Sequence, residues 1–137
     1  MPTLRHLSTS LALLGMSLAS AHAQTALHCD VTYAGQTQRI AVTRTDDAYT
    51  VPSVAIGGRF RFKALQVQGA LAQPRVDLYV YRQDEDRAVL IQHVAWSAPL
   101  PEPPIGATVD WTGKQHLYSG PLERELIYQC FAQRPAP

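Results

Sequence analysis

A histidine and an aspartate two positions apart, His28 and Asp30, are the residues of this sequence best suited to bind a metal ion. Side chains at positions i and i+2 of an extended strand point to the same face, so the imidazole and the carboxylate are placed to contact one ion. Copper and zinc accept nitrogen and oxygen ligands of this kind. The spacing therefore predicts a candidate metal site, and the alternative is a solvent-facing pair on an outer strand.

Two groups of surface residues could instead bind a ligand. Arg59, Arg61 and Lys63 alternate along one predicted strand and form a line of positive charge. This line either pairs with acids on neighbouring strands or contacts an anionic glycan, a lipid head group or an acidic protein. Tyr79 and Tyr81 share one face of another predicted strand, as a second buried layer or as an exposed platform for sugar or peptide. The acids considered for pairing are Asp77, Glu123 and Glu125.

Patterns that indicate nucleophilic catalysis are absent from the sequence. It contains no Gly-x-Ser-x-Gly motif, and its two cysteines are better explained as a disulfide than as nucleophiles. Glycine-rich loops of the nucleotide-binding kind are absent as well. We therefore predict a protein that is not an enzyme, with no catalytic residues and no cofactor.

The N-terminal segment has the features of a secretory signal peptide. Arg5 precedes an apolar run over 7–18, and a small-x-small cleavage pattern follows at 21–23. Cleavage after this pattern divides the chain into a signal peptide, 1–23, and a single all-β domain, 24–137. The apolar run is too short to cross a bilayer. We therefore predict no transmembrane segment and a periplasmic or secreted protein.

The charge balance limits the kind of partner. The chain has a formal net charge of +1, and the loss of Arg5 with the signal peptide leaves the domain neutral. A neutral domain has no general attraction for nucleic acid, so nucleic-acid binding is not expected. The expected partner is an envelope or extracellular protein or a glycan, and the oligomeric state stays open.

The two cysteines predict how the ends of the domain are joined. Cys29 and Cys130 are the only cysteines, and such a pair in an exported chain indicates one disulfide. The bond would place the first and last predicted strands side by side and enclose most of the domain in one loop. The chain-entropy treatment assigns such a loop roughly 4–5 kcal/mol of stabilisation as an upper figure.

Alternation of apolar and polar residues, typical of strands with one buried face, runs through most of the domain. A change of parity within one strand predicts a β-bulge near Ala64 and Leu65. The run 88–97 is apolar on both faces, which favours a central strand, and His93 shares the parity of its buried residues. Four prolines in 98–104 predict an extended crossing between two sheets. Strands are expected over 27–33, 37–43, 48–51, 59–67, 75–81, 88–97, 108–111, 115–118 and 122–131.

The pattern as a whole predicts an all-β fold. We expect a small antiparallel β-sandwich, immunoglobulin-like and of about eight strands, with the disulfide joining the first and last strands; the alternative is a small β-barrel. The predicted function is that of an exported, non-catalytic binding or interaction module. Two alternatives are a small protein inhibitor of a cell-wall or host enzyme and a periplasmic copper- or zinc-binding protein.

Overall fold

The structure of the protein is a computed structural model that describes residues 24–69 and 73–136. The predicted signal peptide, 1–23, lies outside the described residues, and so does part of the loop predicted after the strand at 59–67. Across the described ranges, no helix is long and apolar enough to cross a membrane.

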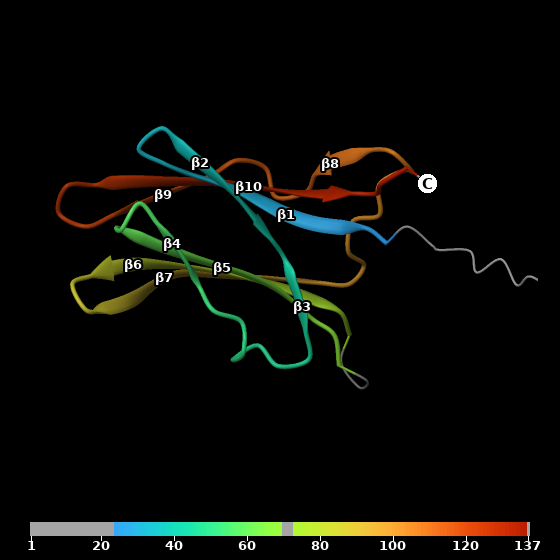
Figure 1. Cartoon of the computed structure of the whole chain (residues 1–137), viewed down its shortest axis with the longest axis horizontal. Helices are drawn as coiled ribbons and strands as arrows, with labels where there is room; N and C mark the ends of the chain where they lie inside the picture. The colour runs from blue at the N-terminus through green and yellow to red at the C-terminus, as the bar shows by residue number, and fades with distance from the viewer. Residues whose placement is uncertain (1–23, 70–72, 137) are drawn as a thin grey trace, which may run out of the picture.

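Within the described residues, ten strands form two sheets, which are the upper and lower layers of Figure 1. The first sheet has the order β2-β1-β10-β8, with β9 also paired to β10; the second has the order β3-β5-β6-β7, with β4 also paired to β5. The first sheet contains β1 (Ala26–Tyr33), β2 (Gln36–Ala41), β8 (Thr108–Asp110), β9 (Gln115–Ser119) and β10 (Arg124–Gln133). The second contains β3 (Thr43–Thr45), β4 (Val54–Ile56), β5 (Phe60–Val67), β6 (Arg75–Asp84) and β7 (Arg87–Ser97).

This arrangement confirms the predicted all-β sandwich, with more strands than the sequence suggested. Among the described strands, all pairs are antiparallel except β3 with β5, which run parallel. The alternative of a small barrel is wrong, because the described strands form two separate open sheets rather than one closed sheet.

The core lies between the two sheets and follows the alternation of the sequence. Inward-facing side chains of β1 and β10 meet those of β5 and β6, and Phe62 of one sheet packs against Tyr128 of the other at 5.3 Å between ring centroids. The fully buried members include Val31, Leu126 and Tyr128 from the first sheet and Phe60, Phe62, Val76, Leu78 and Val80 from the second.

The predicted disulfide between Cys29 and Cys130 is confirmed, and it joins directly opposed residues of β1 and β10. The backbone of Cys130 forms its hydrogen bonds away from β1: its N–H donates to Thr112 Oγ1, and its carbonyl accepts from the N–H of Trp111. The two cysteines therefore form a non-hydrogen-bonded pair, the position in an antiparallel ladder where side chains approach most closely. Both sulfurs are buried in the core.

Two segments carry the chain from one sheet to the other. After β2 the chain passes Val42 and joins the second sheet as β3, which is visible in Figure 1 as a continuous descent between the layers. The proline-rich segment 98–104 leads from β7 in the second sheet to β8 in the first, as predicted.

The strand predicted over 48–51 is wrong, and these residues form a loop instead. Their backbone donors are used locally: Thr50 N–H donates to the Asp47 carbonyl, and Tyr49 N–H donates to the Asp47 carboxylate. A strand needs these groups for a neighbouring strand, so an Asp side chain that captures them favours a turn.

The predicted bulge near Ala64 and Leu65 is also wrong, because the β5–β6 register runs without a shift from Phe60 to Val67. The bulge lies in the next pair, β6–β7, where consecutive residues Val80 and Tyr81 face Gln92 and Leu90 and leave Ile91 as the extra residue. An extra residue reverses the side-chain parity of the strand beyond it.

The bulge also corrects the predicted position of the strand at 88–97. This strand, β7, lies at the edge of the second sheet and contains no buried residue. By register, Val89 faces the core before the bulge, and Val94 and Trp96 face it afterwards; Ile91, the extra residue, also packs against the core. Apart from Leu90, which faces outward, the apparent two-faced apolar pattern is therefore one inward face with a changed parity. His93 consequently lies on the outer face rather than in the core.

Candidate binding face on the second sheet

The outer face of the second sheet carries a buried carboxylate, which is unusual for a surface that faces away from the core. Asp77 points outward from β6 and has no exposed side-chain area. Its oxygens accept hydrogen bonds from Arg75 Nε at 2.8 Å and from His93 Nε2 at 2.8 Å. The bond to Asp77 raises the pKa of Arg75. Both partners are partly exposed, so they satisfy the buried charge while their remaining polar atoms stay accessible.

The aromatic ring of Tyr79 is enclosed by its cross-strand neighbours. The His93 ring stacks on it with 4.3 Å between centroids and 4° between planes. Lys63, on the opposite side of β6, places Nζ over the ring at 5.5 Å from its centroid. With both ring faces occupied in this way, Tyr79 offers a ligand its edge and its hydroxyl group rather than a flat stacking surface.

Tyr81 continues the row along β6, with its ring nearly parallel to that of Tyr79 at 6.3 Å between centroids. Burial raises the pKa of Tyr79, and the negative charge of Asp77 adds to the effect. Burial raises the pKa of Tyr81 as well. Both phenols therefore keep their protons at neutral pH and can donate hydrogen bonds to a partner.

A loop over 46–53, which joins β3 to β4, lies against the same face; in Figure 1 it extends from the second sheet away from the first. Arg61 holds the loop with hydrogen bonds from its guanidinium to Ser53 Oγ at 2.7 Å and to the Ser53 carbonyl at 2.8 Å. Lys63 Nζ donates to the Ala48 carbonyl at 2.6 Å. The loop is thus fastened to β5 at two points.

The three residues of the predicted line of positive charge differ in their contacts. Arg61 and Lys63 hold the 46–53 loop, whereas Arg59 lies at the end of the sandwich and lines a separate cleft. Two of the three acids considered as partners are engaged elsewhere: Asp77 with Arg75 and His93, and Glu125 with His116 and Tyr118. The third, Glu123, makes no ion pair with a described residue.

Two exposed apolar side chains flank the polar cluster. Tyr49, at the tip of the loop, is 96% exposed, and Leu90, which is paired with Tyr81 across β6 and β7, is 50% exposed. Tyr49 lies near enough to Tyr79 to contribute to its raised pKa. We call the surface made by these side chains the outer face; its members are Tyr49, Tyr79, Tyr81, Leu90 and His93.

The candidate metal ligands His28 and Asp30 lie on the opposite side of the molecule, on the outward side of β1. The His28 ring stacks on Phe131 at 5.4 Å between centroids, and burial followed by the charge of Arg39 lowers the pKa of His28. Both oxygens of Asp30 accept hydrogen bonds from Arg39, at 2.8 and 2.9 Å, which lowers the pKa of Asp30.

Among the residues that the structure describes, no group of three or more His, Cys, Asp or Glu side chains is placed to hold a metal ion. The pair His28 and Asp30 would therefore have to release Arg39 and recruit further ligands from beyond the described residues. The metal site stays a prediction.

The sequence analysis considered Asp77 only as a partner for the basic residues and gave His93 the parity of buried residues, so it did not predict that these two residues pair and organise the outer face. They are 16 positions apart, and the bulge at Ile91 places them on the same face. The available signal was the aspartate itself, since an acid between Val76 and Leu78 in a buried strand needs a partner across the sheet.

Comparisons of the chain with known protein families, with functionally described proteins and with solved structures find no match.

Proposed function

We propose that this protein is an exported, non-catalytic interaction module that binds an envelope or extracellular protein through the outer face. The observation that supports it is the concentration of tyrosine, histidine and exposed leucine around the buried Asp77 on one sheet face. Tyrosine and other aromatic residues are enriched at protein interfaces, where rigid rings give contact area at a low entropic cost.

A protein partner fits this surface better than a glycan. Sugar binding by an aromatic platform needs ring faces that are free to stack on a pyranose, and those of Tyr79 are occupied by His93 and Lys63. The hydroxyl groups, the imidazole and the exposed side chains of Tyr49 and Leu90 suit a mixed polar and apolar protein surface.

Export is supported by two independent features. The signal-peptide pattern at 1–23 predicts secretion, and the Cys29–Cys130 disulfide is of the kind that persists in oxidising compartments. Inhibition of a cell-wall or host enzyme would be one form of such protein binding, and no contact in the structure favours that form over others.

Capture from an envelope extract tests the proposal. The immobilised protein is compared with a Tyr49→Ser/Leu90→Ser variant, whose two changes affect only exposed side chains, and with a Tyr118→Ser control on the first sheet, where Tyr118 is 63% exposed. We expect one protein to be retained by the wild type and the control, with about a tenfold or greater loss in the double variant. Equal retention by all three would contradict the assignment of the outer face.

A further inference from the structure

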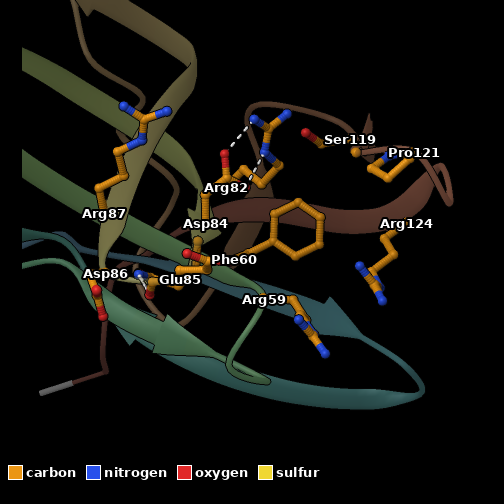
Figure 2. A pocket seen from close by; sticks show the side chains of 12 residues that line it. Arg59, Phe60, Arg82, Asp84, Glu85, Asp86, Arg87, Ser119, Pro121 and Arg124 are labelled. Carbon is orange, nitrogen blue, oxygen red and sulfur yellow. Dashed lines mark hydrogen bonds and ion pairs between the residues drawn. The ribbon is translucent and has the colours of Figure 1, made fainter.

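One end of the sandwich opens between the two sheets into a cleft of about 570 Å³ (Figure 2). The cleft is bounded by the start of β5, by the hairpin that joins β6 to β7 and by the turn that joins β9 to β10. Its lining includes Phe60, Arg59, Arg82, Asp84, Ser119 and Arg124. It is distinct from the outer face, whose five members do not line it.

Arginines occupy positions of this cleft where the strand pattern requires inward-facing residues. Arg82 is paired with the buried Phe60 across β5 and β6, so it continues the inward row of β6 beyond Val80. Arg124 precedes the buried Leu126 by two residues on β10 and therefore also faces inward. The apolar core thus ends at Phe60, and charged side chains replace apolar ones at this end of the sandwich.

Only some of these charges are neutralised within the protein. Arg82 donates to both oxygens of Asp84, at 2.6 and 2.5 Å, an ion pair that raises the pKa of Arg82 and lowers that of Asp84. Arg59 and Arg124 make no side-chain hydrogen bond or ion pair with any residue that the structure describes.

Two of the arginines that have no partner among the described residues, Arg59 and Arg124, lie on the same side of the cleft, and a third, Arg87, lies apart from them at the start of β7. Figure 2 shows the side chains of Arg59 and Arg124 near the buried ring of Phe60, while Glu85 and Asp86 are on the far side, at the hairpin tip. Two guanidinium groups close to an apolar floor form a surface of concentrated positive charge, although the domain as a whole is balanced.

We propose that this cleft binds an anionic group, a carboxylate or a phosphate, between Arg59 and Arg124. The planar guanidinium offers paired N–H donors that match two oxygens of such a group. Arg82 is already neutralised by Asp84 in the wall of the cleft. The anion would therefore be bound by Arg59 and Arg124 rather than by Arg82. The cleft volume suits a small acid or the acidic end of a larger molecule.

Titration with sodium phosphate and, separately, with sodium succinate tests this site. Arginine side-chain N–H resonances are followed by NMR at constant ionic strength, with sodium chloride as the reference salt. We expect saturable shifts for Arg59 and Arg124 with at least one of the two probes. Tighter binding of phosphate would indicate a phosphate ester as the ligand, and tighter binding of succinate would indicate a carboxylic acid.

Arg59→Gln and Arg124→Gln are each expected to weaken binding by about tenfold or more, because each removes a charged bidentate donor. Arg39→Gln, in the exposed pair with Asp30 on the other side of the molecule, is the matched control and is expected to bind as the wild type does. If a Gln variant does not fold, Arg124→Lys and Arg59→Lys keep the charge without the paired donors and are expected to bind more weakly than the wild type. Shifts that never saturate, or binding that survives in the variants, would overturn the proposal. The Tyr49→Ser/Leu90→Ser variant is expected to keep anion binding. The proposal for the cleft is therefore tested independently of the proposal for the outer face.

Discussion

At the scale of single residues, Asp77 illustrates the consequence of placing a charge where a strand is buried on both faces, between Val76 and Leu78. Its carboxylate has no exposed area, whereas its partners Arg75 and His93 are 49% and 42% exposed. The partners can therefore return to water if the aspartate is removed, but the aspartate cannot do so if the partners are removed. The loss of unfolding free energy therefore depends on whether the carboxylate or its hydrogen-bond donors are removed.

This asymmetry gives the first prediction. The Arg75→Ala/His93→Ala variant leaves a buried carboxylate without its donors and is expected to lose about 3–5 kcal/mol of unfolding free energy. Adding Asp77→Ala to it is expected to restore part of that loss. Urea denaturation measures all three proteins. A triple variant that is less stable than the double variant would show that Asp77 does not carry a buried charge.

His28 gives a prediction about pH. Burial and the charge of Arg39 lower its pKa below the ordinary value of 6.5, so the unfolded chain takes up the proton before the folded protein does. Stability is therefore expected to fall as the pH drops through 6.5, and Asp30, whose pKa is lowered from 3.8, extends the loss to lower pH.

The measurement is urea denaturation of the wild type and of His28→Gln at pH 7.5 and at pH 5. The loss of stability between these two conditions is expected to be smaller in the variant, which has no titrating group at this position. Identical losses in the two proteins would mean that His28 is not responsible.

At the scale of elements, the sequence predicted the inward rows correctly wherever the alternation is uninterrupted. The rows of β1, β6 and β10 lie where the period of two places them. A bulge does change the side-chain parity of a strand in this fold, but the sequence predicted the bulge in β5 and the structure has it in β7. In β5 the outward Leu65 is buried, so both parities carry apolar residues without any irregularity. Burial of an outward-facing residue by groups distant in sequence cannot be recognised from alternation alone.

The 46–53 loop gives the third prediction. Arg61→Met and Lys63→Met keep much of the apolar stem of each side chain but remove the hydrogen bonds to Ser53 and Ala48. Amide hydrogen exchange within the loop is expected to become about tenfold faster or more in the double variant, with a change in global stability of roughly 1–2 kcal/mol.

Arg59→Met is the control for this experiment, because Arg59 belongs to the end cleft and makes no contact with the loop through a side-chain hydrogen bond. Exchange in the control is expected to equal that of the wild type. Unchanged exchange in the Arg61→Met/Lys63→Met variant would contradict the fastening of the loop by these side chains.

At the scale of the whole molecule, the disulfide and the period of two were sufficient to predict an all-β fold whose first and last strands are neighbours. The same information could not separate a sandwich from a barrel, since that choice depends on which strands leave one sheet for the other. The structure shows these crossings at Val42 and in the proline-rich segment, and only the second has a strong signal in the sequence. The candidate site was predicted through Tyr79 and Tyr81 but without Asp77 and His93.

Loss of the disulfide tests the closure of the chain. Cys29 and Cys130 are 101 positions apart, so the Cys29→Ser/Cys130→Ser variant frees a long loop in the unfolded state and is expected to lose up to roughly 4–5 kcal/mol. Thermal and urea unfolding measure the loss, and intact mass under denaturing conditions confirms that the wild type has no free thiol. A variant as stable as the wild type would contradict this prediction.

Site-specific photo-crosslinking tests the proposed binding face most directly. A photoreactive side chain is placed in turn at Tyr49, Leu90 and Tyr118, three exposed positions of which only the first two belong to the outer face, and each protein is irradiated in an envelope extract. Our account predicts that Tyr49 and Leu90 yield an adduct with the same protein and that Tyr118 yields none. An adduct only at Tyr118, or equal adducts at all three positions, would contradict it.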